Sequence, residues 1–341
     1  MTTIRDVAAA CGVSPMTVSF VLNNKRGQVS EETRERVLKA VRQMGYRPRA
    51  VERHRRAASV LTLGLVTGVT SESLVTSGYY TDLLRGLVMA ADALEHNLTV
   101  FSNHLFRSDA HQSIRVYCDG RCDGLLLIAP SIGNPVVPAL RERGVPFALV
   151  GDTGEDTALP CADVANVAGG EQSAQYLLAQ GHRRIAFLGG PDFVHSALER
   201  QQGFRRALAA AGIPVRPEWV VQDLVRAGGQ AERLHGIMAV RGDARPTAVL
   251  CWNDGSAQEA IETLHEMGLR VPEDVSVIGF DDDAPALALG LTTFRQPYNE
   301  IGRCAIEILA AQVRRERMET PRVLLPATLV VRGTVGPPPD F

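Results

Sequence analysis

The sequence predicts an α/β protein with a small all-α head at its N-terminus and a larger body of two lobes built on parallel sheets. Three observations predict this. Residues 3–45 show helical spacing and helix caps. Apolar strand-like runs alternate with helical stretches from residue 58 to residue 335. Charge divides the chain at the same place, since residues 1–56 hold twelve Lys and Arg against five Asp and Glu, a net charge of +7, and the remainder carries −9.

A first helix is predicted over residues 4–11. Thr3 is placed to cap it, with Asp6 at the third position, as in a capping box. Gly12 then supplies a turn. One face of this helix should be buried, and it carries Val7, Ala8 and Cys11.

A second helix follows the turn. Ser14 is a favourable N-cap, and Pro15 takes the first helical position, where its missing N–H costs nothing. Val18, Val21 and Leu22 recur at helical spacing and should face the core. The opposite face then carries Met16, Thr17, Ser19, Phe20 and Asn23.

A third helix is expected after Ser30, with Glu31 and Glu32 at its positive end, and Gly45 ends it. Its apolar stripe is Val37, Leu38, Val41 and Met44. Two short helices joined by a glycine turn and sealed by a third form a helix-turn-helix head, whose second helix enters the DNA major groove. The residues expected at DNA are Thr3, Ser14, Pro15, Met16, Thr17, Ser19, Phe20 and Asn23.

An apolar pair on that outward face fits DNA because thymine presents a methyl group in the major groove. Thr17, Ser19 and Asn23 can hydrogen-bond phosphates or base edges. An alternative stays open for Phe20, which could instead cover the edge of the small core. The basic head on an acidic body also indicates a polyanionic partner.

Several classes of function find no support in the sequence. It contains no phosphate-binding, dinucleotide-binding or nucleophile-elbow motif, and its only lysines are Lys25 and Lys39 in the head. We therefore expect no catalytic residues and no cofactor. No metal site is expected either, because the cysteines lack zinc-site spacing, His104 and His111 are too far apart, and His182 looks like a turn residue. No apolar run is long enough for a membrane span, and no secretion signal precedes the head.

The body alternates strands and helices. Helices are expected over residues 80–96 and 196–212. The strand candidates are residues 60–67, 98–103, 123–129, 146–151, 184–189, 246–252 and 274–280. These are too many strands for one compact half, so two βαβ lobes are predicted, with a ligand at the carboxyl ends of the strands.

Polar side chains stand at three of those strand ends: Asp152, Asn253 and Asp281. Carboxylates and amides there can bind vicinal hydroxyls, and Arg200 can fork onto a ligand oxygen. Aromatic rings for stacking on an apolar sugar face are Trp252, Tyr79 and Tyr80. Other roles are expected for their neighbours: Asp254 caps its helix, Asp282 and Asp283 are solvated or capping, and Tyr79 can equally be plain packing.

The stretches "TIRDVAAACGVSPMTVSFVLNN" and "VSEETRERVLKAVRQMGYRP" resemble the head of the LacI/GalR family of bacterial transcription regulators. The body resembles that family's effector domain, which has the periplasmic sugar-binding-protein fold, through "GHRRIAFLGGP", "RQQGF", "WNDGSAQEA", "VSVIGFDDD" and "LTTFRQPYNEIG". The recognition helix departs from the family, where an arginine or histidine is frequent at the position of Phe20, and it opens on the apolar pair Pro15 and Met16. The operator sequence of a relative therefore does not transfer.

The resemblance implies a ligand-responsive, sequence-specific DNA-binding regulator, most often a repressor, in the cytoplasm. A carbohydrate-acting enzyme or a solute-binding protein with the same two-lobed fold is the alternative. The expected partners are a near-palindromic double-stranded operator, a small sugar-like effector and a second copy of the chain, as a dimer rather than a tetramer because "GPPPDF" is too short for a zipper. The expected effector contacts are Tyr80, Asp152, Arg200, Trp252, Asn253, Asp281 and Gln296.

The domain boundaries follow from the same resemblance. They are a head over 1–48, a hinge over 49–57, an effector domain over 58–335 and a tail over 336–341, with one lobe formed by 58–163 plus 294–322 and the other by 164–293 plus 323–335. In the family a hinge leucine enters the minor groove at the operator centre. The matching position here is Arg55, with Arg53 beside it, and arginine favours a narrow, A/T-rich groove.

Overall fold

A computed structural model describes residues 3–22, 29–44, 60–68, 71–101, 114, 116–154, 156–222, 229–240, 242–316 and 321–339. The chain divides into two compact units, Met1–Arg56 and Ala57–Phe341. Among the described residues no single helix could cross a membrane, and the pair Ile4–Cys11 and Pro15–Val21 meets the length and composition test only as a pair bent by 98°.

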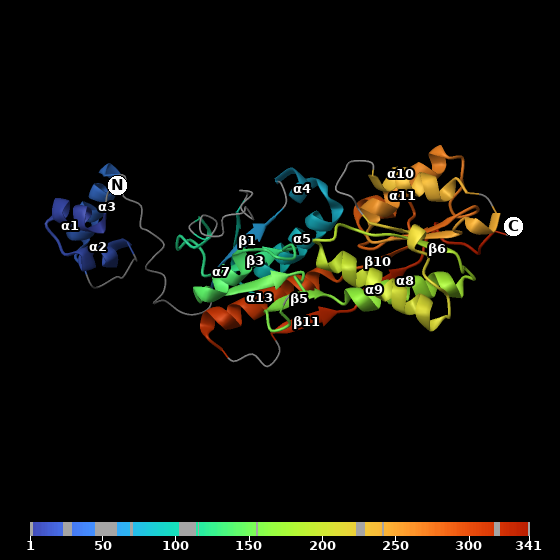
Figure 1. The fold of residues 1–341 in the computed structure, drawn as a ribbon. Helices are drawn as coiled ribbons and strands as arrows, with labels where there is room; N and C mark the ends of the chain where they lie inside the picture. The colour runs from blue at the N-terminus through green and yellow to red at the C-terminus, as the bar shows by residue number, and fades with distance from the viewer. Residues whose placement is uncertain are drawn as a thin grey trace. The chain divides into compact units, whose positions relative to one another are not determined.

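The first unit is the predicted three-helix head (Figure 1). Its helices are α1 (Ile4–Cys11), α2 (Pro15–Leu22) and α3 (Glu31–Gln43). The capping box is confirmed, since the Asp6 N–H donates to Thr3 Oγ1 at 3.3 Å and the Thr3 N–H donates to Asp6 Oδ2 at 2.7 Å. Gly12 turns the chain with a φ of 62°. The buried core is Val7, Ala8, Cys11, Val18, Val21 and Val37.

Some predictions for this unit fall outside the described residues. They are the end of α3 at Gly45, the side chain of Leu22, and the DNA contacts Asn23, Arg53 and Arg55. The rest of the predicted α3 stripe, Leu38, Val41 and Met44, packs against the core partly buried.

The second unit contains the two predicted lobes, each on a parallel sheet (Figure 1). The sheet of the first lobe has the order β11-β5-β4-β3-β1-β2. Its strands are β1 (Thr62–Thr67), β2 (Asn97–Phe101), β3 (Gly124–Ile128), β4 (Phe147–Val150), β5 (Cys161–Val164) and β11 (Arg322–Leu325). The sheet of the second lobe has the order β7-β6-β8-β9. Its strands are β6 (Ile185–Leu188), β7 (Val220–Val221), β8 (Ala248–Cys251) and β9 (Ser276–Ile278).

A third, antiparallel pair of strands joins β10 (Thr293–Arg295) to β12 (Thr328–Val330). One lobe boundary is corrected here. Residues 323–325 were assigned to the second lobe, but β11 pairs with β5 in register, Val323 beside Ala162, and so belongs to the first lobe. Pairing between strands this far apart in the chain is not visible in a local sequence pattern.

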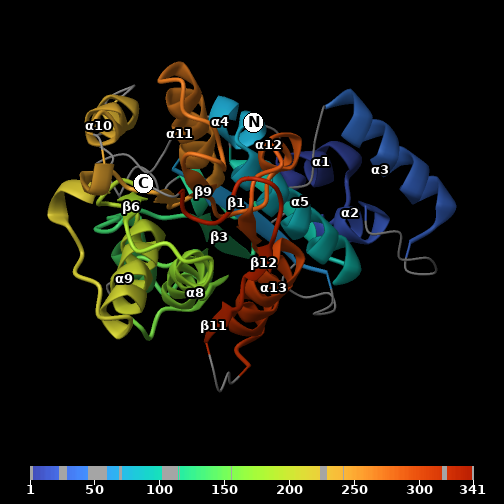
Figure 2. The same ribbon diagram turned by 90° about the vertical axis from the view of Figure 1, so that its right-hand side faces the viewer.

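Helices cover both sheets. The helices are α4 (Ser71–Thr76), α5 (Gly78–Ala93), α7 (Val136–Glu142), α8 (Asn166–Ala179), α9 (His195–Ala210), α10 (Gly229–Met238), α11 (Asp254–Glu266), α12 (Ala284–Ala288) and α13 (Tyr298–Arg314), with short 3₁₀ turns at Pro217–Trp219 and Gly242–Ala244. In the second lobe α8 and α9 cover one face and α10 and α11 the other, as Figure 2 shows. In the first lobe α13 packs on α5 and on the central strands.

The strand predictions hold for β1, β3, β4, β6, β8 and β9, and for the part of the β2 candidate that is described. Apart from the edge strand β2, these strands are almost wholly buried, as expected for parallel sheets covered on both faces. Strand β5 was not predicted, because the charged Asp163 interrupts its apolar run.

Candidate functional site

The outward face of α2 is arranged as the sequence predicts. Met16 keeps 64% of its surface exposed, whereas Val18 and Val21 are buried. Ser14 caps α2, its Oγ accepting the Thr17 N–H at 3.1 Å, and Thr3 caps α1. Pro15 is exposed, and Ser19 and Phe20 are half-buried, so both roles considered for Phe20 remain compatible with its position.

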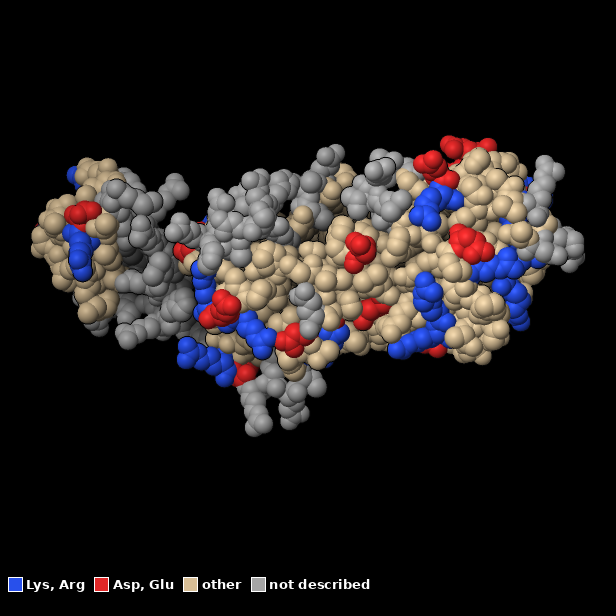
Figure 3. Space-filling view, viewed as in Figure 1, with Lys and Arg blue, Asp and Glu red and all other residues tan. Residues whose placement is uncertain are grey.

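On the face drawn in Figure 3, the described residues of the body show no surface of a single charge sign. There the described Arg side chains of the body lie scattered among Asp and Glu, in several places blue beside red. On that face the described residues therefore form no continuous basic field that would suit a polyanion.

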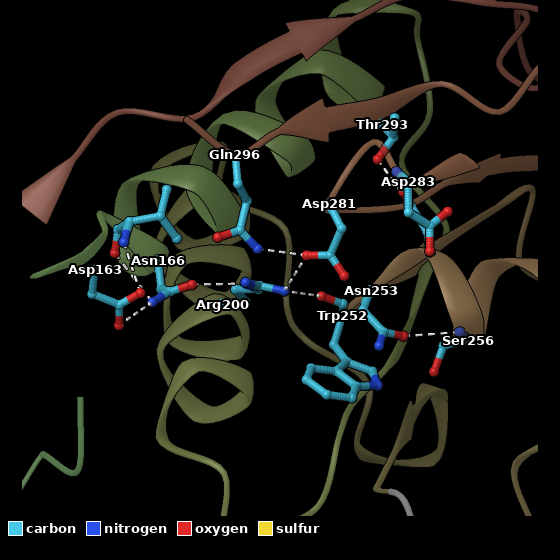
Figure 4. A network of polar contacts seen from close by, with 12 residues as sticks. Asp163, Asn166, Arg200, Trp252, Asn253, Ser256, Asp281, Asp283, Thr293 and Gln296 are labelled. Carbon is cyan, nitrogen blue, oxygen red and sulfur yellow. Dashed lines mark hydrogen bonds and ion pairs between the residues drawn. The ribbon is translucent and has the colours of Figure 1, made fainter. Parts of the chain in front are cut away.

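A buried polar network lies where the strand ends of the second lobe meet α8 and α9, and Arg200 is its centre (Figure 4). Arg200 Nε donates to Asn166 Oδ1 at 2.9 Å, and Nη1 donates to the Trp252 carbonyl at 2.6 Å. Its guanidinium also lies 3.8 Å from the centroid of the Phe280 ring. These contacts fix the guanidinium from several sides.

Two glycines bring α8 and α9 close enough for that arrangement. A Cβ on Gly170 would lie 2.1 Å from the Arg200 carbonyl oxygen, and one on Gly203 would lie 2.0 Å from the Val167 carbonyl oxygen. Only glycine permits this backbone approach. The stretch "RQQGF" therefore places Arg200 as well as supplying it.

Asp281 faces Arg200, with 3.6 Å between its Oδ1 and Arg200 Nη1. Gln296 Nε2 donates to the same Oδ1 at 2.6 Å. The backbone at Asp281 has a φ of 131°, a region that L-residues seldom adopt, and such strain concentrates at functional sites. Burial raises the pKa of the Asp281 carboxyl well above its ordinary value, and Arg200 opposes that shift.

Aromatic rings lie beside this pair. Tyr79 and Tyr80 on α5 have ring centroids 5.0 Å apart, and Tyr79 and Tyr298 have centroids 5.9 Å apart. Burial raises the pKa of Tyr80 to about 12, and it also raises the pKa of Tyr79 well above its ordinary value. Trp252 joins the network through its main-chain carbonyl, and in Figure 4 its indole extends away from the Asp281–Gln296 pair.

Two neighbours have roles other than those predicted. Asn253, not Asp254, caps α11, its Oδ1 accepting the Ser256 N–H at 2.8 Å. Asp254 is buried instead and accepts from Thr293 Oγ1 at 2.6 Å, and burial raises its pKa to about 6. The two residues are adjacent acceptors, so the sequence could not separate the cap from the first helical residue.

Of the predictions for the next two carboxylates, the one for Asp283 is confirmed and the one for Asp282 is wrong. Asp283 caps α12, as expected, with its Oδ1 accepting the Ala286 N–H at 3.0 Å. Asp282 is neither solvated nor capping, because Arg295 holds its Oδ2 at 2.6 Å and Arg332 holds its Oδ1 at 2.5 Å.

Asp152 lies in a second group of charges. Arg322 Nη2 donates to its Oδ2, and the Gly154 N–H donates to its Oδ1 at 3.1 Å. Burial alone would raise the pKa of Asp152, but these hydrogen bonds bring it below its ordinary value. Across from it stand His195 and Glu199 of α9.

Asp163 connects the two groups. Its Oδ2 accepts from the Asp152 N–H at 3.2 Å and from Asn166 Nδ2 at 3.2 Å, and Asn166 in turn accepts from Arg200. Burial raises the pKa of Asp163 to about 7. Sequence reasoning missed the following members of the two groups: Asp163, Asn166, His195, Glu199, Tyr298 and Arg322.

His182 is not a turn residue but a buried junction. Its Nδ1 lies 2.9 Å from Thr247 Oγ1, and its Nε2 lies 3.1 Å from Ser276 Oγ and 2.9 Å from the Gly336 carbonyl oxygen. It joins Thr247, directly before β8, to Ser276 on β9 and to Gly336 near the C-terminus, so its role is structural.

Comparisons with known proteins agree with this arrangement. Residues 3–49 match the family model "Bacterial regulatory proteins, lacI family", and residues 174–335 match the "Periplasmic binding protein-like domain". The chain is 32% identical over 339 residues to the HTH-type transcriptional repressor PurR of Photobacterium profundum, covering 98% of this chain and 99% of that one.

Two solved structures share the whole fold. The transcriptional regulator CelR in its cellobiose complex has a TM-score of 0.74 at 29% identity, covering 98% of this chain and 100% of that chain. The lac repressor dimer bound to operator and the anti-inducer ONPF has a TM-score of 0.74 at 26% identity, covering 98% and 99%. The chain therefore belongs to the lacI family of bacterial regulatory proteins and is a ligand-responsive, DNA-binding transcriptional repressor rather than an enzyme.

Proposed function

We propose that this repressor binds a near-palindromic operator as a homodimer in the cytoplasm, and that a small neutral, sugar-like effector sets its operator affinity. The observation that carries the effector half is the buried pair of Arg200 and Asp281, 3.6 Å apart. Because the two charges compensate each other, a neutral polar ligand can enter without leaving either one buried and unpaired. A net-charged ligand would upset that balance.

The side chains around the pair suit vicinal hydroxyl groups. Arg200 donates, Asp281 accepts, and the Gln296 amide can do both. Tyr80 and the Trp252 indole offer ring faces on which a sugar could stack. Asn253 lies near the carboxyl end of β8, beside Trp252. Asp152 belongs to the contacts expected from the family pattern. That CelR, a relative of the same fold, was solved with cellobiose supports a carbohydrate as the ligand class.

The outward face of α2 supplies the DNA contacts. Exposed Met16 suits thymine methyl groups, and Thr17, Ser19 and Asn23 suit phosphates or base edges. Thr3 and Ser14 stand at helix N-termini, where backbone N–H groups attract phosphate. The half-buried Phe20 can add an apolar contact at the groove.

Exposed apolar side chains on neighbouring elements of the first lobe support a homodimer. They are Val75 on α4, Val88 and Met89 on α5, and Val100 on β2. A surface of this kind commonly marks a protein interface. Two heads held by such a dimer would meet two half-sites related by two-fold symmetry.

The proposal is tested by selecting bound sequences from a random DNA pool with the full chain. We expect two inverted half-sites with T-rich steps, and a carbohydrate panel should contain at least one member that shifts operator affinity. Met16→Ala should weaken binding to the selected operator by about 1–3 kcal/mol, a typical value for one base contact. Glu35→Gln, an exposed change on α3, is the matched control. Recovery of unrelated sequences would refute the DNA half, and an unresponsive operator complex would refute the effector half.

The hinge residue Arg55 gives a separate prediction, which rests on the family resemblance because Arg53 and Arg55 lie outside the described residues. An arginine is drawn to a narrow minor groove, whereas a leucine wedges a base step open. Wild type should therefore lose affinity when the central base pairs change from A/T to G/C with intact half-sites, and Arg55→Leu should bend the operator more. Indifference to the centre in wild type, with unchanged bending in Arg55→Leu, would show the idea to be wrong.

A further inference from the structure

Three side chains of the kinds that bind metals converge where the two lobes face each other. Asp152 follows β4 in the first lobe, and His195 and Glu199 stand on α9 in the second. His195 Nε2 lies 3.4 Å from Glu199 Oε1 and 3.8 Å from Asp152 Oδ2. All three donor atoms lie within 4.8 Å of one another, and no other such group was found in the described part of the chain.

The separations fit a common coordination sphere. A tetrahedral zinc ion binds nitrogen and oxygen at about 2.0–2.2 Å, which places two of its ligand atoms roughly 3.3–3.6 Å apart. The pair on α9 already has this spacing, because residues four apart share one face of a helix. Asp152 Oδ2 lies 3.8 Å from His195 Nε2, a little beyond this spacing, so Asp152 has to move inward to complete the site.

The surroundings also suit an ion. Asp152 is 5% exposed, and His195 and Glu199 are half-buried, so the donors are shielded from bulk water. One buried polar atom nearby that could face a cation, the hydroxyl Oγ1 of Thr153 next to Asp152, lacks a hydrogen-bond partner among the described residues. Incomplete hydrogen bonding of this kind is expected where water or an ion completes a site.

We propose that Asp152, His195 and Glu199 bind a first-row divalent metal ion, for which Zn²⁺ is the best match. One imidazole and two carboxylates are ligands that zinc accepts, with the fourth position left to water or another oxygen. Since the ligands come from both lobes, the ion favours the conformation in which the lobes have their present separation. Metal binding is then coupled to any ligand that selects between lobe conformations.

Arg322 is a competitor of the ion for Asp152. Its guanidinium donates to Asp152 Oδ2, the oxygen nearest His195, and supplies positive charge there. The ion and the guanidinium compete for that oxygen. Removing the guanidinium should therefore tighten metal binding, whereas it would only weaken a group held together by ion pairs.

The test uses the full chain, freed of metal by a chelator and titrated with Co²⁺ while the visible absorption of the bound ion is followed, and then with competing Zn²⁺. We expect one ion per chain. His195→Ala and Glu199→Gln should each lower the affinity for the metal ion by at least about 10-fold. Loss of a residue that only supports a metal ligand already costs about that much. Arg322→Gln should raise it. His265→Ala, which removes an exposed histidine near Glu262 on α11, should leave affinity unchanged.

Absence of a stoichiometric ion in wild type would overturn the assignment, and so would equal losses in His265→Ala and His195→Ala. Glu199→Gln keeps the size of the side chain and removes only its charge. It therefore still tests the site if His195→Ala fails to fold. The titration contains neither DNA nor effector, so its failure would leave the proposed repressor function intact.

Discussion

Replacing Arg200 by alanine is expected to abolish the response to the effector while operator binding is retained. The change removes the hydrogen bonds to Asn166 and to the Trp252 carbonyl, and the stacking on Phe280. It also removes a charged donor that the ligand would use, worth about 1.5–3 kcal/mol, or roughly 10- to 150-fold in effector affinity. Asp281→Ala should act in the same direction, because it removes the acceptor of the same pair.

The measurement is operator affinity as a function of effector concentration, by fluorescence anisotropy. Arg205→Ala is the matched control, since Arg205 is an exposed arginine on the same helix. The stability of Arg200→Ala must also be measured, because this change leaves Asp281 buried without its counter-charge. If both site variants respond at the wild-type effector concentration, the effector does not bind at this pair.

Replacing His182 by alanine is expected to lower the free energy of unfolding by about 3 kcal/mol. The change leaves Thr247, Ser276 and the Gly336 carbonyl without their shared partner and opens a cavity. Each unsatisfied buried group costs about 1–3 kcal/mol, and the remaining Ser276–Gly336 bonds recover part of it. Urea unfolding measures the change, and His265→Ala, at an exposed histidine, should stay within about 0.5 kcal/mol of wild type.

The same residue gives a dependence on pH. Burial lowers the pKa of His182 below its ordinary value of 6.5, so the folded state releases this proton more readily than the unfolded state. Its contribution to stability is therefore complete above pH 6.5 and is lost as the pH falls from 6.5 through the folded-state pKa. His182→Asn, which cannot titrate, should show a shallower loss of stability over that range. A slope equal to that of wild type would assign the acid sensitivity to other groups.

Local signals in the sequence were sufficient for the head and for most strands. The cap at Thr3, the turn at Gly12 and the proline at position 15 act over a few residues, and the structure confirms each of them. Continuous apolar runs likewise identify strands that are buried on both faces. Where a strand carries a buried charge, as β5 does at Asp163, the pattern fails because the compensating hydrogen bonds come from elsewhere in the chain.

The residues of the site likewise fall into those that the sequence predicts and those that it does not. Arg200, Asp281 and Gln296 were predicted, and the structure brings them together. Asn166, Tyr298 and Arg322 were missed because nothing near them in the sequence indicates that they contact Arg200, Tyr79 and Asp152 respectively. Those contacts depend on how α8, α13 and β11 return to the sheet, which is a property of the tertiary fold.

The position of β11 bears on how the chain acquires its structure during synthesis. Translation delivers β1 to β5 first, then the whole second lobe, and only afterwards α13 and β11, which complete the first lobe. Until residue 325 has left the ribosome, β5 is an open parallel edge with unpaired N–H and C=O groups, and such edges recruit other strands. The strands of the second lobe's sheet, β6 to β9, follow one another in the chain, and only their contacts with the C-terminal residues form later. The nascent chain should therefore depend on chaperones chiefly through its first lobe, and prematurely terminated products should aggregate through β5.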